Sequence, residues 1–184
     1  MYDELSIIRA IQRKSDRTAA DTLVRQYYDE IQGYMRKQTR NEEDALDLTQ
    51  ETFISMLRTI KLYDSKKGAS FRTWLYKVAT NKVVDFFRAR SARITNTLPL
   101  EDVEIAEETD FIDCIADKDL FEKIINSVNT LPAETQAIFR LRVFGDQTFP
   151  QIAESLHMPE NSVKSKYHRL LAALRKEFKN NDRE

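Results

Sequence analysis

Glycine and proline are scarce in this sequence, with three and four residues among 184. Both residue types interrupt regular structure and are typical of the tight turns that join short strands. The residues that recur instead, such as leucine, alanine, glutamate and lysine, favour helices and return at helical spacing. The sequence therefore predicts an all-α protein. Its length allows one ordinary domain, or two small helical domains, which we expect here.

Cysteine and histidine are also nearly absent. The single cysteine, Cys114, has no partner for an internal disulfide bond, and two histidines, His157 and His168, are too few for a zinc site. No segment approaches the roughly 20 consecutive apolar residues that span a bilayer, and the first residues lack the basic and apolar stretches of a secretory signal. We therefore expect a cytoplasmic protein with no metal or other cofactor.

Sequence motifs of catalysis are missing as well. There is no glycine-rich phosphate-binding loop, no cluster of metal ligands, and no nucleophile beside a sequence-local base. The sequence does not exclude a catalytic site assembled in space from paired carboxylates, although no pattern indicates one. We expect a protein that is not an enzyme and has no small-molecule substrate.

Charge is unevenly distributed along the chain, although the formal net charge is only −1. Residues 61–93 carry an excess of seven basic groups, and residues 94–123 an excess of eight acidic groups. Residues 94–117 contain no lysine or arginine, which is typical of a mobile acidic linker. The pattern predicts a polyanion-binding domain over residues 1–93, this linker, and a second domain over residues 118–184.

Apolar residues at intervals of three and four predict the helices of the first domain. Two amphipathic helices fit residues 3–34, and a third helix is expected from about Glu42 to Ile60, with Asn41 as its cap. The expected buried face of this third helix consists of Leu46, Phe53, Leu57 and Ile60. A longer helix is expected over residues 71–92, with Ser70 as a candidate cap.

A second face of the third helix is polar and acidic. Its members step by three or four residues and include Asp44, Asp47, Gln50 and Glu51. A solvated helix face is the default interpretation of such a stripe. Leu48 and Ile54 lie beside it, however, and apolar residues within a charged surface are typical of a protein-docking face. Both interpretations stay open on this pattern alone.

The helix over residues 71–92 combines aromatic with basic side chains. A small helical domain needs most of these aromatic residues for its core, so a core helix with a solvated basic face explains the composition as well as nucleic-acid binding does. A polar stripe of Thr73, Lys77, Asn81 and Arg88 favours binding. A cationic channel with aromatic and amide side chains suits the splayed bases of a single strand.

The strongest local signal is a helix-turn-helix pattern in the second domain, where helices are expected over residues 149–156 and 160–179. The second of these carries six lysines or arginines against two glutamates. A purely structural hairpin of helices is the alternative. In DNA-binding versions, the start of the second helix enters the major groove, where short polar side chains meet base edges and basic ones meet phosphates.

Three segments in this order resemble a bacterial sigma-70 family factor of the extracytoplasmic-function (ECF) group. They are DALDLTQETFISML, FRTWLYKVATNKVVDFF and, after the acidic linker, LPAETQAIFRLRVFGDQTFPQIAESLHMPENSVKSKYHRLLAALRK. The resemblance covers nearly the whole chain. It implies a sigma-2-like helical bundle and a sigma-4-like helix-turn-helix domain that together bind RNA polymerase core and direct promoter-specific transcription initiation, in a stress or cell-envelope response.

The resemblance also implies a role for each polar surface. The third helix would dock on the clamp helices of the beta-prime subunit through Asp44, Asp47, Gln50, Glu51 and Ile54, and the second domain would dock on the beta flap. The residues implied for the minus-ten element, where a base of the non-template strand is held extruded, are Lys66, Lys67, Arg72, Trp74, Lys77, Asn81 and Arg88. Those implied for the minus-thirty-five element are Asn161, Ser162, Lys164, Ser165, Lys166, His168 and Arg169.

Further expectations follow from the same resemblance. Promoter DNA is one partner, and an anti-sigma factor that holds the protein at the membrane is another. The acidic linker would thread the RNA exit path of the polymerase. Neutralising its glutamates should then change the yield of abortive transcripts; the residues concerned are Glu101, Glu104, Glu107 and Glu108.

The sequence departs from the family pattern around the helix-turn-helix. His157 and Met158 stand where a glycine-containing turn is common, and Phe149-Pro150 and Tyr167-His168 also differ from the pattern. The minus-thirty-five preference is therefore the least transferable property. The alternative function is a one-component helix-turn-helix regulator that binds duplex operator DNA without core polymerase.

Overall fold

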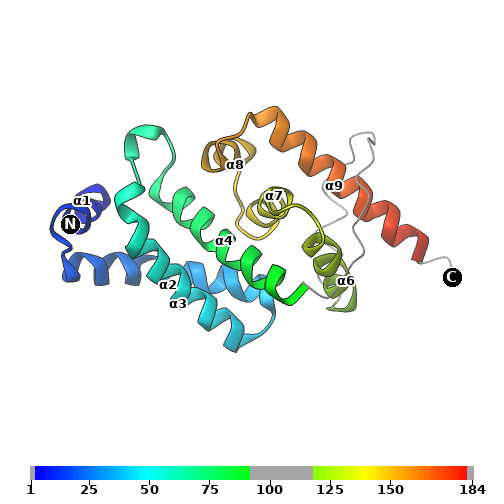
Figure 1. Cartoon of the computed structure of the whole chain (residues 1–184), viewed down its shortest axis with the longest axis horizontal. Helices are drawn as coiled ribbons and strands as arrows, with labels where there is room; N and C mark the ends of the chain where they lie inside the picture. Colours follow the sequence, from blue (N-terminus) through cyan, green and yellow to red (C-terminus); the bar gives the residue numbers. More distant parts are fainter. Residues whose placement is uncertain (1–2, 92–117, 182–184) are drawn as a thin grey trace. The chain divides into compact units, whose positions relative to one another are not determined.

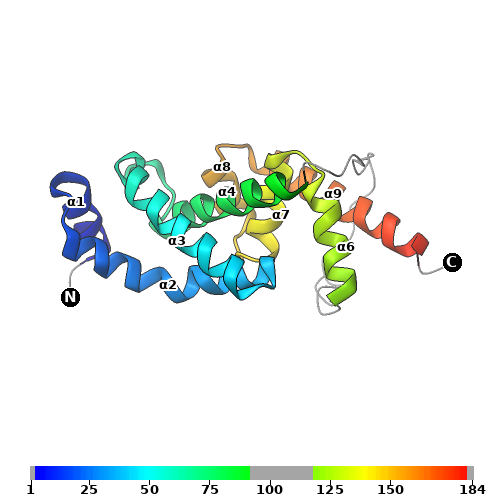
Figure 2. The ribbon, with the colours of Figure 1, turned by 60° about the horizontal axis from the view of Figure 1, so that its bottom comes forward.

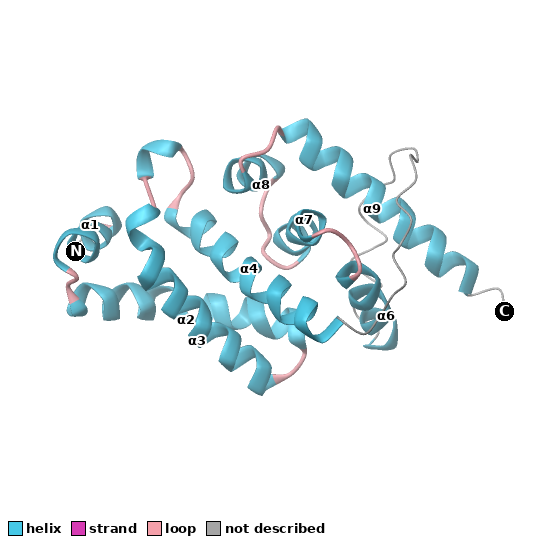
Figure 3. Ribbon diagram, in the orientation of Figure 1, coloured by secondary structure: helices cyan, strands magenta, loops and turns pink. Residues whose placement is uncertain are grey.

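The computed structural model describes residues 3–91 and 118–181, and in these two ranges all regular structure is helical. Figures 1 and 3 show the helices and the loops that join them. The chain divides into two compact units, Met1–Val83 and Val84–Glu184. The all-α prediction is confirmed. The expected linker over residues 94–117, with Cys114 and the four glutamates, lies outside the described residues, and the predicted boundaries at residues 93 and 117 stay predictions.

The first unit contains three α-helices, two 3₁₀ helices and, up to Val83, most of a fourth α-helix, α4. Their bounds are α1 Glu4–Lys14, α2 Arg17–Thr39, α3 Glu42–Thr59, η1 Ile60–Leu62, η2 Ser65–Lys67 and α4 Phe71–Ser91. Helix α2 packs against both α1 and α3 (Figure 2). Its side of the core consists of Leu23, Tyr27, Ile31, Tyr34 and Met35. Inside the unit, the hydroxyl groups of Tyr34 on α2 and Thr80 on α4 form a buried hydrogen bond of 2.7 Å.

Side chains cap the N-termini of the longer helices in this unit, where backbone N–H groups have no partner within the helix. The carboxylate of Asp16 accepts from Thr18 N and Ala19 N at the start of α2. The side chain of Asn41 accepts from Asp44 N at 3.0 Å, and that of Ser70 accepts from Thr73 N at 3.1 Å. The predicted caps at Asn41 and Ser70 are therefore confirmed.

The buried face of α3 differs from the expected one. Phe53 and Ile60 are buried as predicted, but Leu46 is 38% exposed and Leu57 is 39% exposed. Leu48, which was expected beside the docking stripe, is instead 4% exposed and belongs to the core. Successive residues of an α-helix are rotated by about 100°, so a face assigned one residue out of phase turns part of its members toward solvent.

The second unit begins with the end of α4 and contains four further helices among the described residues, α6 Lys118–Asn129, α7 Ala133–Val143, α8 Phe149–Leu156 and α9 Glu160–Asn181. Helix α9 packs against α7 and α8. Its core side consists of Val163, Tyr167, Leu170, Leu171 and Leu174, each of them buried. The helix-turn-helix predicted from the sequence therefore forms, with α8 ending and α9 beginning at the expected residues.

Candidate nucleic-acid interface

One face of α4 carries polar side chains in the stripe expected for nucleic-acid contact. Asn81 and Arg88 are exposed, and Trp74 and Lys77 are partly exposed. Their spacing of three, four and seven residues places all four on one side of the helix. Burial lowers the pKa of Lys77 below its ordinary value, because a charged ammonium is poorly solvated there. A bound phosphate would offset that cost, so the stripe is electrostatically suited to an anion.

Thr73 does not belong to this stripe. It is 2% exposed, and the Ser70 hydroxyl donates to its hydroxyl at 3.0 Å. The sequence pattern included it because a threonine on a basic helix is equally compatible with a surface position and with a cap. In the folded chain its role is local, at the start of α4.

Arg72 lies on the opposite side of α4 from the stripe. Its guanidinium forms an ion pair with Glu30 of α2 and lies 4.6 Å from the ring centre of Tyr76. The Tyr76 hydroxyl also donates to Glu30, at 2.9 Å. Arg72 therefore joins α2 to α4, and the structure does not bring it together with Asn81.

The loop before α4 is held by aromatic contacts. The ring of Tyr63 lies 5.3 Å from that of Phe71 and 5.6 Å from that of Trp74, and the Tyr63 hydroxyl donates to Ala69 O. Gly68 has a φ of 94°, a backbone conformation that favours glycine. These contacts fix a short loop on which Lys66 and Lys67 are exposed to solvent, beside the start of the α4 stripe.

The outward face of α3 is acidic at its centre and apolar along one edge. Asp47, Gln50 and Glu51 are exposed, Asp44 is partly exposed, and Ile54 is 50% exposed. The carboxylate of Glu51 lies 3.7 Å from the Lys82 ammonium on α4. This ion pair is long and exposed to solvent, so Glu51 can exchange Lys82 for a partner's cation at little cost. The structure thus brings together all five residues that the sequence resemblance assigned to polymerase docking.

Two exposed leucines extend this face and a third lies just after α3, and all three were missed as surface residues. Leu46 and Leu57 lie along its edge, and Leu62 in η1, just after α3, is 77% exposed. The signal was present in the sequence, since residues 46, 50, 54 and 57 share one side of a helix. Exposed leucines beside carboxylates are the composition of a surface that another protein covers.

The outward side of α9 carries short polar side chains in its first turns. Asn161 and Ser165 are exposed, Ser162 and Arg169 are partly exposed, and the buried residues of these turns, Val163 and Tyr167, lie on the other side. This is the arrangement required of a helix that inserts its N-terminal half into a groove.

Two of the predicted α9 contacts are engaged in ion pairs at the surface. Lys164 pairs with Glu160 at 2.6 Å, and Lys166 pairs with Glu134 of α7 at 2.9 Å. Exposed pairs of this kind are worth about 1 kcal/mol or less, so a phosphate could replace either glutamate. Both lysines therefore remain compatible with phosphate contact.

His168 occupies a different environment from the other α9 candidates. Its ring lies 5.9 Å from that of Phe149 and 5.8 Å from that of Tyr167, and its buried Nδ1 has no hydrogen-bond partner among the described residues. The structure places this side chain against the start of α8. Its predicted contact with DNA is the one that this geometry supports least.

Within residues 3–91 and 118–181, no group of histidine, cysteine, aspartate and glutamate side chains could hold a metal ion. In the same part of the chain, no helix has the length and apolar character needed to cross a membrane.

Two family descriptions match the chain, each over a different part of it. Sigma-70 region 2 matches residues 23–93, and Sigma-70 region 4 matches residues 121–174. The ECF RNA polymerase sigma factor SigW of Bacillus subtilis is 27% identical over 91% of this chain and 92% of its own length. This chain belongs to the ECF group of the sigma-70 family.

Other members of the family are similar to the chain at comparable levels. The ECF sigma-E factor of Haemophilus influenzae is 26% identical over 92% of this chain and 93% of its own length. The ECF sigma factor SigE of Mycolicibacterium smegmatis is 30% identical over 81% of this chain and 57% of its own. The chain therefore shares both domains with relatives of this group, and not the helix-turn-helix alone.

Solved structures share the fold of the chain. CnrH, in complex with the cytosolic domain of CnrY, has a TM-score of 0.60 at 20% identity and covers 97% of this chain and 99% of its own. The sigma factor RpoE of Bartonella quintana, in complex with the anti-sigma factor NepR, has a TM-score of 0.52 at 13% identity over 86% and 96%.

Membership of the sigma-70 family organises the surfaces described above. The region 2 match spans α3, the loop before α4 and α4, and the region 4 match spans most of the described second unit. The exposed α3 face, the α4 stripe and the outward side of α9 are thus the surfaces of one sigma factor. A one-component regulator, the alternative considered from the sequence, would need only the last of them.

Proposed function

We propose that this ECF sigma factor binds RNA polymerase core through α3, opens the minus-ten element through the loop 64–70 and α4, and reads the minus-thirty-five element through α9. The observation that carries the proposal is that the segment matched by region 2, residues 23–93, has two chemically different surfaces. One is the acidic and apolar face of α3, and the other is the basic and polar stripe of α4. A protein partner suits the first, and a nucleic acid suits the second.

The surface of this chain that we propose to dock on polymerase consists of the five residues predicted from the sequence together with Leu46 and Leu57. Like other docking surfaces, it combines charged groups with exposed apolar area. The carboxylates of Asp47 and Glu51 favour a basic partner and set its orientation, while Ile54 and the leucines supply apolar area. The clamp helices of the beta-prime subunit are the proposed partner.

At the minus-ten element, Trp74, Lys77, Asn81 and Arg88 form the proposed surface for the non-template strand. The amide of Asn81 can donate to and accept from the edge of an extruded base, and the cations neutralise neighbouring phosphates. Lys66 and Lys67 extend this positive surface along the loop. We propose a positioning role for Arg72, through its ion pair with Glu30, in place of direct contact.

At the minus-thirty-five element, the exposed start of α9 supplies the proposed contacts. Asn161 and Ser165 are placed for base edges, and Lys166 and Arg169 for phosphates. Docking of the second domain on the beta flap would bring this helix to the promoter together with the minus-ten surface.

We further propose that an anti-sigma factor regulates the protein, which acts in the cytoplasm in a stress or cell-envelope response and has no catalytic role. Support comes from the shared fold of CnrH and RpoE, which were solved with CnrY and with the anti-sigma factor NepR respectively. An exposed apolar face such as that of α3 needs a cover when polymerase is absent. An anti-sigma factor that competes for this face would supply it.

The test is transcription in a purified system. Core polymerase and the chain together should start transcripts from a supercoiled promoter library, and neither should do so alone. Mapping of the transcript starts would then identify the two promoter elements. Tight binding of the chain alone to a duplex, with no effect of added core, would instead favour the one-component regulator.

A further inference from the structure

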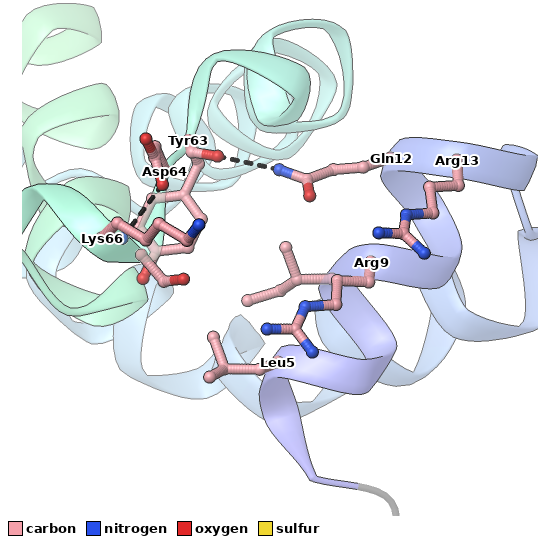
Figure 4. A pocket seen from close by; sticks show the side chains of 9 residues that line it. Leu5, Arg9, Gln12, Arg13, Tyr63, Asp64 and Lys66 are labelled. Atoms are coloured by element: carbon pink, nitrogen blue, oxygen red, sulfur yellow. Dashed lines mark hydrogen bonds between the residues drawn. The ribbon is translucent and has the colours of Figure 1, made fainter.

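A small basic cavity lies in the first unit between α1 and the segment that leads into the minus-ten loop. Its volume is about 270 Å³, and Arg9 and Arg13 from α1 face Lys66 from η2 across it (Figure 4). Arg9 and Arg13 are four residues apart and therefore on the same side of α1. Asp64 is the one carboxylate in its lining. The cavity thus has an excess of two positive charges, and no role proposed above uses its two arginines.

The walls of the cavity are held in place by hydrogen bonds. The side-chain amide of Gln12 donates to Ile60 O at 2.8 Å and to Tyr63 O at 2.9 Å, which joins α1 to the first residue of η1 and to the residue that follows η1. The Asp64 carboxylate accepts from Lys66 N at 3.0 Å, so part of its charge is used to order η2. The cations are therefore brought together by the fold and do not meet by chance.

The three cations of the cavity are not engaged in ion pairs with any described residue. Other arginines of the same unit do have partners, as Arg25 has in Asp21 and Arg36 in Glu42, each at 2.8 Å. Gathering like charges without counter-charges opposes folding, because they repel one another. An anion that enters the cavity would relieve this repulsion.

The chemistry of the cavity favours a phosphate group. Two guanidinium groups offer planar pairs of donors that match phosphate oxygens, and the ammonium adds a third cation. The apolar side chains of Leu5 and Ile8, both on α1, also line the cavity. A phosphodiester, which has one negative charge and an apolar sugar beside it, fits this lining better than a free ion that needs solvation on all sides.

We propose that this cavity binds a backbone phosphate of single-stranded DNA that leaves the minus-ten loop. Lys66 belongs to both the cavity and the loop, so a strand whose bases are held by the loop passes the cavity mouth. The source of the phosphate rests on the proposed function, whereas the phosphate chemistry rests on the cavity alone. The contact would hold the displaced strand on α1 without reading its sequence.

The test compares two double variants of the full chain that remove the same charge. Arg9→Gln with Arg13→Gln empties the cavity of its guanidinium groups. Lys14→Gln with Arg17→Gln is the control, because both residues are exposed, close in sequence and outside the cavity lining. Binding of a thymidine octanucleotide is measured by fluorescence anisotropy over a range of salt concentrations, and the guanidinium N–H resonances are followed by NMR.

The cavity variant should bind the octanucleotide at least about tenfold more weakly than the wild type, as expected for lost hydrogen bonds to a charged group. Its slope of log K against log salt should be smaller by about 0.7, the value for one phosphate of a single strand. The control variant should lose less than half as much. In the wild type, the Arg9 and Arg13 resonances should shift on titration.

Equal losses in the two variants would overturn the proposal, because general electrostatics would then explain them. Tripolyphosphate that binds the wild type more tightly than the octanucleotide, and shifts the same resonances, would overturn the assignment to DNA in favour of a free nucleotide. Neither measurement contains polymerase. Failure here is therefore distinct from failure of the transcription test, which bears on the proposed function.

Discussion

At the residue scale, the variant Asn81→Ala best distinguishes a defect in promoter opening from a defect in polymerase binding. Asn81 is exposed and makes no hydrogen bond or ion pair with a described residue, so Asn81→Ala should leave the free energy of unfolding within about 0.5 kcal/mol of the wild type. We expect normal affinity for core and at least a tenfold loss in promoter opening, equivalent to about 1.4 kcal/mol. Permanganate reactivity of unpaired thymines measures opening.

The reciprocal variant is Gln50→Ala on α3. It should weaken core binding and leave opening unchanged once core is saturating. If Asn81→Ala reduced core affinity as much as Gln50→Ala does, the two surfaces would not be separate and the assignment of roles would be wrong.

Charge reversal on α3 tests the docking surface itself. Asp47→Lys with Glu51→Lys should lower the affinity for core by about a hundredfold, because an electrostatically matched patch becomes repulsive. The control is Asp21→Lys with Asp29→Lys, which makes the same change in net charge on exposed positions of α2. Competition with a labelled sigma factor for limiting core gives both affinities, and equal losses would place the docking surface elsewhere.

The buried tyrosines of the first unit predict its stability at alkaline pH. Burial, followed by hydrogen bonds to Glu4 and Glu30 respectively, raises the pKa of Tyr27 and that of Tyr76. An unfolded tyrosine ionises near pH 10, so above about pH 10 the unfolded state loses protons that the folded state retains. The free energy of unfolding should therefore fall with pH there, by at most about 1.4 kcal/mol per pH unit for each tyrosine.

The fluorescence of Trp74, the only tryptophan in the sequence, reports urea unfolding of this unit. Tyr27→Phe and Tyr76→Phe should each make the decline above about pH 10 less steep, because the ionising hydroxyl is gone. Lys77 acts in the opposite direction, since its lowered pKa makes the folded state gain stability as the ammonium loses its proton. Slopes that are unchanged in both variants would contradict the assigned environments.

At the scale of the element, α8 ends in a conformation that its sequence does not favour. His157 has φ 56° and ψ 44°, the left-handed region in which a side chain costs about 1–2 kcal/mol. Its N–H nevertheless donates to Ala153 O and Glu154 O, which closes the helix end. The glycine common at this point of the family pattern would adopt the same backbone without that cost.

His157→Gly should therefore stabilise the second unit. Allowing for the larger entropy of an unfolded glycine, we expect a gain of about 0.5 kcal/mol, or about 2–4 °C in the melting temperature of this unit. His157→Ala is the control, because it removes the imidazole but keeps the backbone cost. Calorimetry in which alanine stabilises as much as glycine would mean that the imidazole, and not the backbone, is unfavourable.

The helices themselves could be predicted from the sequence because their periodicity and caps are local. Asn41 and Ser70 cap the helices expected of them, and α8 has the predicted bounds. The prediction of which side of α3 is buried was wrong in part. Leu46 and Leu57 lie on the exposed face of α3 because the position of α2 decides which side of α3 is covered, and this is a tertiary property.

A tertiary contact also explains why the sequence grouped Arg72 wrongly with the residues of the α4 stripe. The sequence neighbours of Arg72, basic and aromatic, are those of a DNA-binding helix. Its partner Glu30 lies on another helix, and no spacing in the sequence connects the two. Residues of a single helix face, such as Trp74, Lys77 and Asn81, could be grouped correctly because the helix repeat alone places them together.

At the scale of the whole molecule, the net charge of −1 predicts weak DNA binding by the free protein, although we propose two surfaces that contact DNA. Duplex DNA is bound non-specifically through its phosphates, and this chain offers few uncompensated cations to each element. Core polymerase holds both surfaces near one promoter, so the second contact forms at high effective concentration. Selectivity should then reside in the distance between the two elements as much as in their sequences.

Changing that distance is the corresponding experiment. Inserting about five base pairs between the elements rotates one relative to the other by half a helical turn of about 10 base pairs. Each element keeps its sequence, so binding of the chain to either isolated element should not change. Transcription with core should fall at least tenfold, since only one surface can engage at a time. Run-off transcription from promoters with inserts of increasing length measures this, and output that is indifferent to the half-turn insert would mean that α9 contributes no selectivity in the holoenzyme.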